Sequence, residues 1–318
     1  MFIISLQIGR YPVSVGDLVS VLLAKIFPIE HSVPAAVDNV LFQIRLPRII
    51  AAGLVGGALA VAGAAYQGMF RNPLVSPDIL GASAGAAFGG ALGIYLSLGA
   101  SGVQILAFLF GLLAVFASYG IASRIRQDPI LVLVLAGILI GTLFSSATTI
   151  LKLLSDAQDK LPSIVYWMMG SLSQVSPREL PLAAIAMALA LIPLYLVRWR
   201  LNVMAMGEDE AKSLGLDTNR LRLLVILCAT AMTAAAVSIS GLIGWVGLVI
   251  PHLCRLLVGP DHTKLLPASL LIGSAYLLLI DDLARGFTAI ELPLGVLTSL
   301  IGAPFFIYIL LNSRKGWV

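Results

Sequence analysis

Between Arg71 and Gly93 the chain reads RNPLVSPDILGASAGAAFGGALG, a polar turn followed by a run of small residues. Pro73 and Pro77 prevent a continuous helix through the turn, because proline lacks a backbone N–H and disfavours helical geometry in the preceding residue. The run carries glycine at every fourth position: Gly81, Gly85, Gly89 and Gly93. Such a stripe lets two helices approach closely. We therefore predict a hinge that leads into a packing helix.

The composition around this stretch is that of a membrane protein. Of the 318 residues, 59% are hydrophobic and only 11% are charged, and the mean hydropathy is +1.00. Soluble domains carry about 25% charged residues, and a helix needs about 20 apolar residues to cross a bilayer. Runs of that kind lie near 49–67, 80–98, 103–122, 130–154, 180–198, 221–241, 265–284 and 294–311, with a shorter one near 245–257.

The first residues, MFIISLQIG, have the character of the end of one more span. We therefore expect about ten membrane helices, with a sequence that is cut at its N-terminus. The spans must be helical, because open sheets cannot satisfy their backbone groups in lipid. The predicted fold class is an all-α polytopic membrane protein with one transmembrane domain over residues 1–318.

Alternate loops carry different amounts of positive charge. One side of the membrane receives Arg71, Arg124, Arg126, Arg198, Arg200, Lys212, Arg220, Arg222, Arg255, Lys264, Arg314 and Lys315. The other side receives Arg10, Lys25, Arg45, Arg48, Lys152, Lys160, Arg178 and Arg285. The positive-inside rule makes the first side cytoplasmic and places the C-terminus there. The distribution of basic residues thus indicates the orientation of the protein in the membrane, not nucleic-acid binding.

Residues 198–222 form a polar segment between two spans, RWRLNVMAMGEDEAKSLGLDTNRLR. Three acidic residues after Gly207 suit the positive end of a helix, and Gly215 suits its C-terminal cap. Asp217 or Thr218 can cap the helix that follows. We predict a short helix, a turn and a helix that dock a cytoplasmic partner. The alternative is a solvated loop. GEDEAKS lacks the glycines of a phosphate-binding loop, so no ATP is expected there.

Small and polar residues follow one face of the span at 130–154: Gly141, Ser145, Thr148, Thr149 and Lys152. They indicate the lining of a pathway, although hydroxyls can also bond the backbone one turn back.

GASAG (Gly81–Gly85) matches the G-x-S-x-G motif of serine hydrolases, which needs a strand before the serine. A serine protease pairing Ser83 with His252 is a remote alternative. The cysteines and histidines have no metal-site spacing.

Four motifs together resemble the FecCD-type permeases, the membrane subunits of ABC importers for ferric siderophores, haem and cobalamin. The first is QIRLPRIIAAGLVGGALAVAGAAYQGMFRNPLVSPDILGASAG (Gln43–Gly85). The others are YWMMGSL (Tyr166–Leu172), GLVIPHLCRLLVGPDHTKLLP (Gly247–Pro267) and ELPLGVLTSLIGAPFFIYIL (Glu291–Leu310). The resemblance spans essentially the whole chain.

The resemblance implies a type II ABC importer permease in the bacterial inner membrane. Its partners would be a second copy of itself, two ABC ATPase subunits, a substrate-binding protein and the surrounding lipid. The chain would be no enzyme and hold no cofactor, since ATP and Mg would lie on the ATPase. The ATPase would contact Gly207, Glu208, Asp209, Glu210, Ala211, Lys212, Ser213, Leu214 and Gly215.

The family pattern also implies roles for other residues. Arg45 and Arg285 match outer arginines that receive glutamates of the binding protein, with Asp281 orienting Arg285. Asn72 and Leu74 match a cytoplasmic constriction of the pathway. Ile130 and Leu131 stand where the cobalamin permease has small hydroxyl residues, on the loop that enters the fifth span. That departure suits a narrower, drier gate.

Three transport functions stay open at this stage. A metal chelate is the first expectation, and an oxyanion such as molybdate or tungstate could use the same architecture. An ion-coupled secondary transporter is more remote, because it would need acidic residues deep in the spans, and only Asp281 and Asp282 come close.

Overall fold

A computed structural model of the chain describes residues 1–9, 11–26, 33–125, 129–286 and 291–312. These residues form helices and no β-strand, as the sequence predicts. The α-helices are α1 (Phe2–Ser5), α2 (Val15–Ile26), α3 (Ala35–Asn39), α4 (Leu46–Phe70), α5 (Ala82–Tyr95), α6 (Ala100–Ala122), α7 (Pro129–Leu154), α8 (Lys160–Met168), α9 (Leu180–Leu196), α10 (Arg198–Met206), α11 (Glu208–Ser213), α12 (Thr218–Ser240), α13 (Val246–Val258), α14 (His262–Gly286) and α15 (Leu294–Asn312). A π-helix, η1 (Val40–Arg45), joins α3 to α4, and a 3-10 helix, η2 (Pro77–Leu80), precedes α5.

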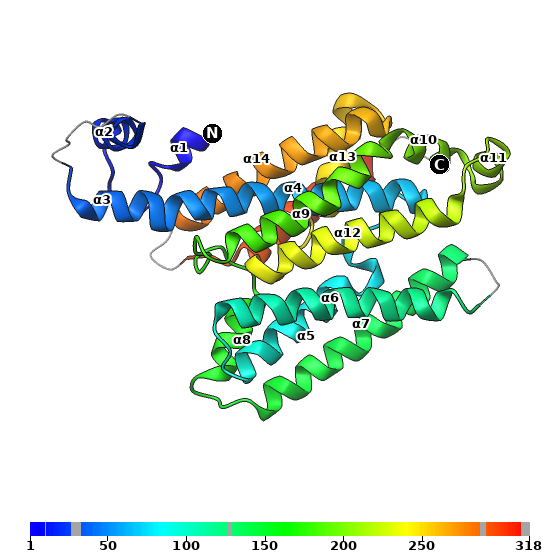
Figure 1. The fold of residues 1–318 in the computed structure, drawn as a ribbon, viewed down its shortest axis with the longest axis horizontal. Helices are drawn as coiled ribbons and strands as arrows, with labels where there is room; N and C mark the ends of the chain where they lie inside the picture. The colour runs from blue at the N-terminus through cyan, green and yellow to red at the C-terminus, as the bar shows by residue number, and fades with distance from the viewer. Residues whose placement is uncertain (10, 27–32, 126–128, 287–290, 313–318) are drawn as a thin grey trace.

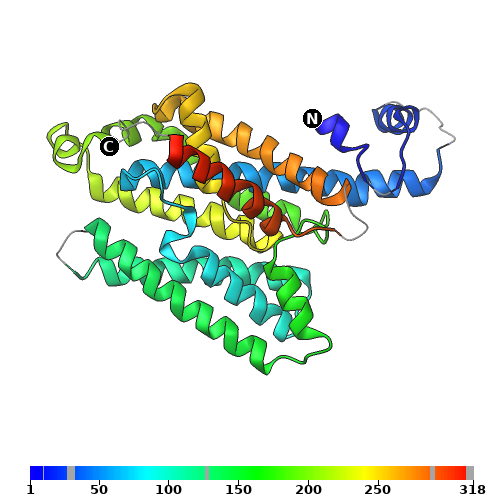
Figure 2. The same cartoon turned by 180° about the vertical axis from the view of Figure 1, so that it is seen from behind.

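The long helices lie side by side along the long axis of the molecule (Figure 1, Figure 2). Helix α4 packs against α12, α13 and α14, while α5, α6 and α7 pack against one another. Helix α12 joins the two groups, because it contacts α4 and α9 as well as α5 and α6. One end of the molecule carries α8 and the other carries α11, and we name these the α8 end and the α11 end.

Helix α4 is the central helix of the fold. In its most apolar window 83% of residues are buried, against 22% for α7. The small residues of α4 explain this burial. A Cβ atom added at Gly56 would lie 2.2 Å from the carbonyl oxygen of Gly273 in α14, and one at Gly63 would lie 1.8 Å from that of Gly247 in α13. Neither backbone contact leaves room for a side chain.

The turn and glycine stripe after α4 follow the prediction. Helix α4 ends at Phe70, and Arg71 adopts the left-handed conformation with φ 50°. On α5, a Cβ atom at Gly85 or Gly89 would lie 2.4 Å from the Phe110 oxygen or 2.2 Å from the Leu106 oxygen of α6. The stripe is therefore the contact surface between α5 and α6.

Every apolar run identified in the sequence coincides with a helix. Five helices in the described residues are long and apolar enough to cross a membrane, or six if α9 and α10, which are bent by 58°, count as one broken span. Helices α5 and α13 and residues 294–308 of α15 are shorter apolar segments. The count of about ten spans stays a prediction.

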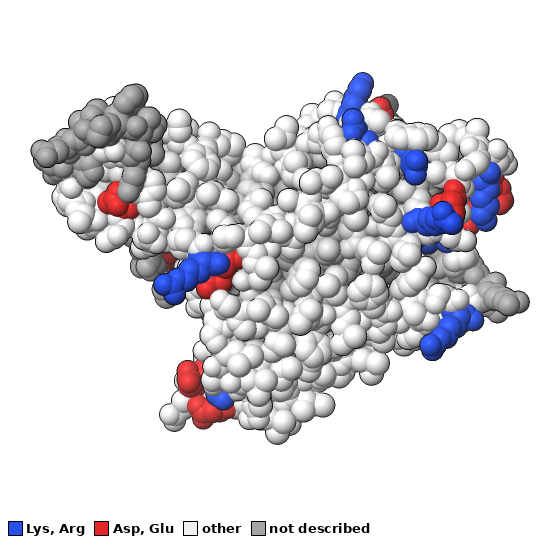
Figure 3. All heavy atoms as spheres, viewed as in Figure 1, with Lys and Arg blue, Asp and Glu red and all other residues white. Residues whose placement is uncertain are grey.

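Charged side chains gather at the two ends of the helices, and the broad middle of the visible face is uncharged (Figure 3). The basic residues assigned to the cytoplasm lie at the α11 end, and those assigned outside lie at the α8 end. The division holds for the described residues, outside which lie Arg10, Arg126, Arg314, Lys315 and the side chain of Lys25.

Candidate functional site

Helix α11 is a short helix that ends in a glycine cap, as the sequence predicts. It starts after Gly207, whose φ of 145° favours glycine, and its first turn holds Glu208, Asp209 and Glu210. At its end the Leu216 N–H donates to the Ala211 oxygen (3.0 Å) and the Gly215 N–H donates to the Lys212 oxygen (2.9 Å). These two bonds form a Schellman cap around the left-handed Gly215.

Glu208 attaches α11 to the start of α12. Its carboxylate lies 2.9 Å from the Lys212 ammonium and 2.8 Å from the guanidinium of Arg222, which is 6% exposed. The hydrogen bond from Lys212, and then the charge of Arg222, lower the pKa of Glu208. Asp217 caps α12 by accepting the Arg220 N–H at 3.1 Å. These contacts fix the segment to the start of α12.

The opposite face of α11 is free for a partner. Ala211 is fully buried, whereas Asp209, Glu210, Lys212 and Ser213 are exposed. Leu214 is 66% exposed and Met206, just before the helix, is 65% exposed. These two apolar side chains and the charged face beside them are accessible to a partner.

Helix α10 is tied to the turn between α13 and α14. The Asn202 amide donates to Asp261 (2.6 Å), and its oxygen accepts the backbone N–H of His262 (2.7 Å) and lies 2.9 Å from its Nδ1. Asp261 also accepts from Thr263, and these hydrogen bonds lower its pKa to about 2. Through α10, the capped segment is therefore joined to α14.

The small polar stripe of α7 lines an open groove of about 460 Å³. Gly141, Ser145 and Thr149 lie along it, opposite Asp78 of η2. A neighbouring depression of about 450 Å³ adds Ser83 and Lys152. The Thr149 hydroxyl donates to the Ser145 oxygen (3.0 Å), so it is already bonded to the backbone one turn back. The stripe offers a smooth, weakly polar surface rather than a tight binding site.

Asn72 and Leu74 lie in the turn after α4 and not in this groove. The Asn72 side chain accepts the Leu74 N–H at 2.9 Å, and Leu74 is 54% exposed. The buried Gln67 amide holds the turn by donating to the Val75 oxygen (3.1 Å), and Arg255 of α13 donates to Gln67. The turn is thus anchored to α4 and α13.

Ile130 and Leu131 occupy the first turn of α7, so their expected position on a loop is corrected. Proline at the first helical position explains the early start, because Pro129 has no N–H to satisfy and its φ suits a helix. Ile130 is partly buried against the core, whereas Leu131 is 55% exposed. Neither residue lines the groove of Gly141, Ser145 and Thr149.

The hydrolase motif finds no support in the described residues. No strand precedes Ser83, whose hydroxyl donates to Asp78 in the same segment. His252 packs its ring against Phe306 of α15, with the centroids 6.1 Å apart. A carboxylate is the partner of this serine, and a nucleophile elbow requires a strand–turn–helix.

Arg45 and Arg285 are both buried in this structure, and their role in docking a binding protein stays a prediction. Arg45 is 4% exposed and donates to the carbonyl oxygens of Leu6 (2.6 Å) and Tyr11 (2.5 Å). Arg285 is 5% exposed and donates to the Ser5 oxygen (2.9 Å) and to Asp282. In this conformation the two arginines hold the N-terminal segment against α4 and α14.

The predicted Asp281–Arg285 pair belongs to a larger buried ionic cluster, whose other members, Arg48 and Glu291, are not among the predicted residues. Arg48 lies 2.9 Å from Asp281 and 3.0 Å from Glu291, and Asp281 is fully buried. Asp281 is 3.5 Å from Arg285, so it contacts both arginines. The signal was an arginine inside an apolar span, which requires an acidic partner. Because Asp281 is paired, it is a poor carrier for a coupling ion.

The fold and these sites define a multi-pass membrane permease. The model of the FecCD transport family matches residues 1–312. The molybdate import system permease protein of Haemophilus influenzae is 41% identical over 99% of this chain and 93% of its own length. The cobalamin import system permease protein of Halobacterium salinarum is 40% identical over 96% and 83%. A solved structure, described as an inward-facing metal-chelate type ABC transporter, has a TM-score of 0.87 and 40% identity, covering 98% of this chain and 95% of that one.

The chain belongs to the FecCD transport family. It is the permease subunit of an ABC transporter.

Proposed function

We propose that the chain is the inner-membrane permease of a binding-protein-dependent ABC importer, and that two copies form the pathway. The observation that carries this proposal is α11. A six-residue helix capped at its C-terminal end, fixed to α12 by Glu208 and exposing Met206 and Leu214, is a rigid docking body. A solvated loop would need none of these contacts. The α11 end then faces the cytoplasm, together with the C-terminus.

ATP-driven closure of two ATPase subunits would move α11. The Glu208–Arg222 pair passes that movement to α12, and the Asn202 contacts pass it to α14. The turn at Asn72 and Leu74, anchored through Gln67, lies at the same end and can narrow the pathway. ATP and Mg belong to the ATPase, and the residues of this chain only transmit motion.

We propose a small metal oxyanion of the molybdate class as the first candidate substrate. The similarity to the molybdate permease extends over nearly all of both chains. The hydroxyl groups of the α7 groove suit the passage of a small hydrophilic solute. A metal chelate is the second candidate, and the cobalamin permease and the metal-chelate type transporter favour it.

The elemental content of cells with and without this gene tests the substrate. We expect molybdenum or tungsten to fall in the deletion strain under metal-limited growth, with iron and cobalt unchanged, and to recover when the wild-type gene is restored. Mass spectrometry of washed cells gives all four elements in one sample. A fall in iron or cobalt instead would select the chelate class, and no change in any metal would contradict the proposed import function.

A further inference from the structure

The largest cavity among the described residues lies at the α8 end and measures about 620 Å³. Its walls come from α8, the turn between α5 and α6, residues 171–179 and the end of α12. The aromatic Tyr166 and Trp167 line it, and aromatic residues of this kind lie at the level of lipid headgroups. The cavity is separate from the α7 groove and the α11 segment, so transport leaves it unexplained.

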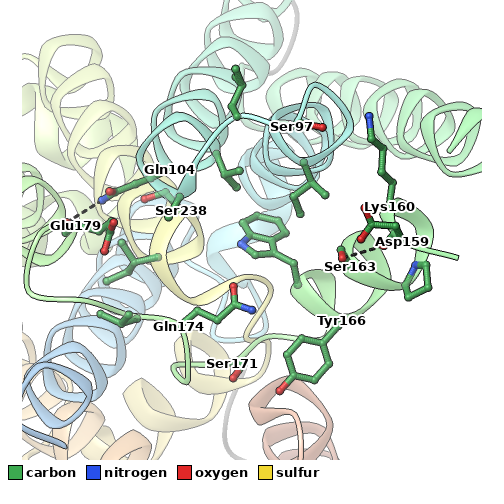
Figure 4. Close-up of a pocket in the computed structure, with 18 residues that line it drawn as sticks. Ser97, Gln104, Asp159, Lys160, Ser163, Tyr166, Ser171, Gln174, Glu179 and Ser238 are labelled. Atoms are coloured by element: carbon green, nitrogen blue, oxygen red, sulfur yellow. Dashed lines mark hydrogen bonds between the residues drawn. The ribbon is translucent and has the colours of Figure 1, made fainter. Parts of the chain in front are cut away.

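The polar groups of this cavity carry unused hydrogen-bonding capacity (Figure 4). Gln104 is 3% exposed and donates its amide to the Glu179 backbone oxygen (3.1 Å), but its Oε1 atom has no partner in the described part of the chain. A buried amide oxygen without a donor is costly, which indicates that a ligand or water supplies one.

The charges of the cavity favour a ligand with an ammonium group. The charged side chains that line it are Asp159, Glu179 and Lys160, and none of them forms an ion pair with another described residue. In Figure 4, Glu179 and Gln104 lie on one side and Asp159 and Lys160 on the other. The Lys160 ammonium donates to the Tyr95 oxygen (2.6 Å) and keeps two further protons. The two carboxylates can bind the ammonium group of a zwitterionic ligand, and the Lys160 ammonium can bind its phosphate.

A second, separate apolar depression of about 10 Å³ lies farther along the same two helices. It is lined by Leu112 and Phe116 of α6 and by Leu227 and Thr230 of α12. Leu112 follows Gln104 by eight residues, and Thr230 precedes Ser238 by eight, so both lie about 12 Å from the cavity along their helices. Phe116 is 52% exposed and Leu227 is 37% exposed, so this depression lies at the molecular surface. A headgroup in the cavity would place its acyl chains there.

We propose that this cavity binds the headgroup of a phospholipid that carries a primary ammonium, such as phosphatidylethanolamine. The ammonium meets Glu179 and the Gln104 oxygen, and the phosphate lies toward Lys160. A choline headgroup has no N–H and cannot satisfy Gln104. The bound lipid would hold α8, whose Trp167 packs so closely on α5 that a Cβ atom at Gly90 would lie 2.2 Å from its ring.

Native mass spectrometry of the purified, delipidated permease tests this binding. We expect dioleoyl phosphatidylethanolamine to bind about tenfold more tightly than dioleoyl phosphatidylcholine, the value of one charge-assisted hydrogen bond. Gln104→Leu and Glu179→Gln should each remove most of that preference. Asp156→Asn, a matched loss of charge just outside the cavity, should keep it.

Other outcomes would overturn the proposal. Equal binding of the two lipids would show that the cavity does not discriminate between their headgroups. Soluble glycerophosphoethanolamine binding as tightly as the lipid would assign the site to a free solute. If both cavity variants weaken association with the binding protein and leave the lipid preference unchanged, the cavity belongs to the docking surface. Two separate variants keep the test valid if one fails to fold.

Discussion

Replacing Ala211 with proline should abolish the association of this permease with its ATPase. The Ala211 N–H donates to the Gly207 oxygen at 3.0 Å, and a proline removes that bond and clashes with the carbonyl group. The cost in a helix interior is about 3 kcal/mol or more, which corresponds to over a hundredfold in an equilibrium constant. Helix α11 has only six residues and no second turn to compensate.

Affinity purification of tagged permease from membranes measures this effect as the amount of ATPase retained. Ser101→Pro is the control, because Ser101 is exposed at the second position of α6, far from α11, where the N–H has no intrahelical acceptor. The control should retain the ATPase, and Ala211→Pro should lose nearly all of it while the permease still reaches the membrane. If the Ala211→Pro variant retains all of the ATPase, α11 is not part of the docking surface.

Replacing Asp281 with asparagine should destabilise the permease by about 3–5 kcal/mol, the usual cost of stranding one partner of a buried ion pair. Asp281 is fully buried and contacts both Arg48 and Arg285. Its loss would leave the buried guanidinium groups of Arg48 and Arg285 with fewer negative charges to balance them.

Arg220→Ala is a matched control for this change. Arg220 and Asp217 are also 2.9 Å apart, but their side chains are 89% and 53% exposed. Exposed pairs contribute about 0–1 kcal/mol. Denaturant unfolding in detergent micelles, followed by circular dichroism, should therefore separate the variants clearly. Asp281→Asn unfolding at the wild-type midpoint would show that the cluster contributes little.

The parts of the structure that sequence could predict are local ones. Apolar runs of helix length, the turn at Pro73 and the glycine stripe of α5 all depend on neighbouring residues, and each is confirmed. The caps at the end of α11 and the start of α12 could also be predicted from sequence, because Gly215 and Asp217 act within a few residues of their own positions.

The remaining features depend on contacts between distant segments. Arg48 and Asp281 are 233 positions apart, so no spacing rule pairs them. Arg45 lies at the end of a span, but its acceptors are the backbone oxygens of Leu6 and Tyr11, 39 and 34 positions away. The cavity beside α8 arises from four separate segments, and only the fold brings Gln104 and Glu179 together.

Uptake into proteoliposomes tests the central claim most directly. The permease is reconstituted with its ATPase, and the binding protein is supplied outside with radiolabelled molybdate or a radiolabelled ferric siderophore. We predict uptake of one of these solutes that requires enclosed ATP, the ATPase and the binding protein, and that persists when ionophores abolish the proton and sodium gradients. Uptake that follows an ion gradient without ATP would contradict the account and identify a secondary transporter.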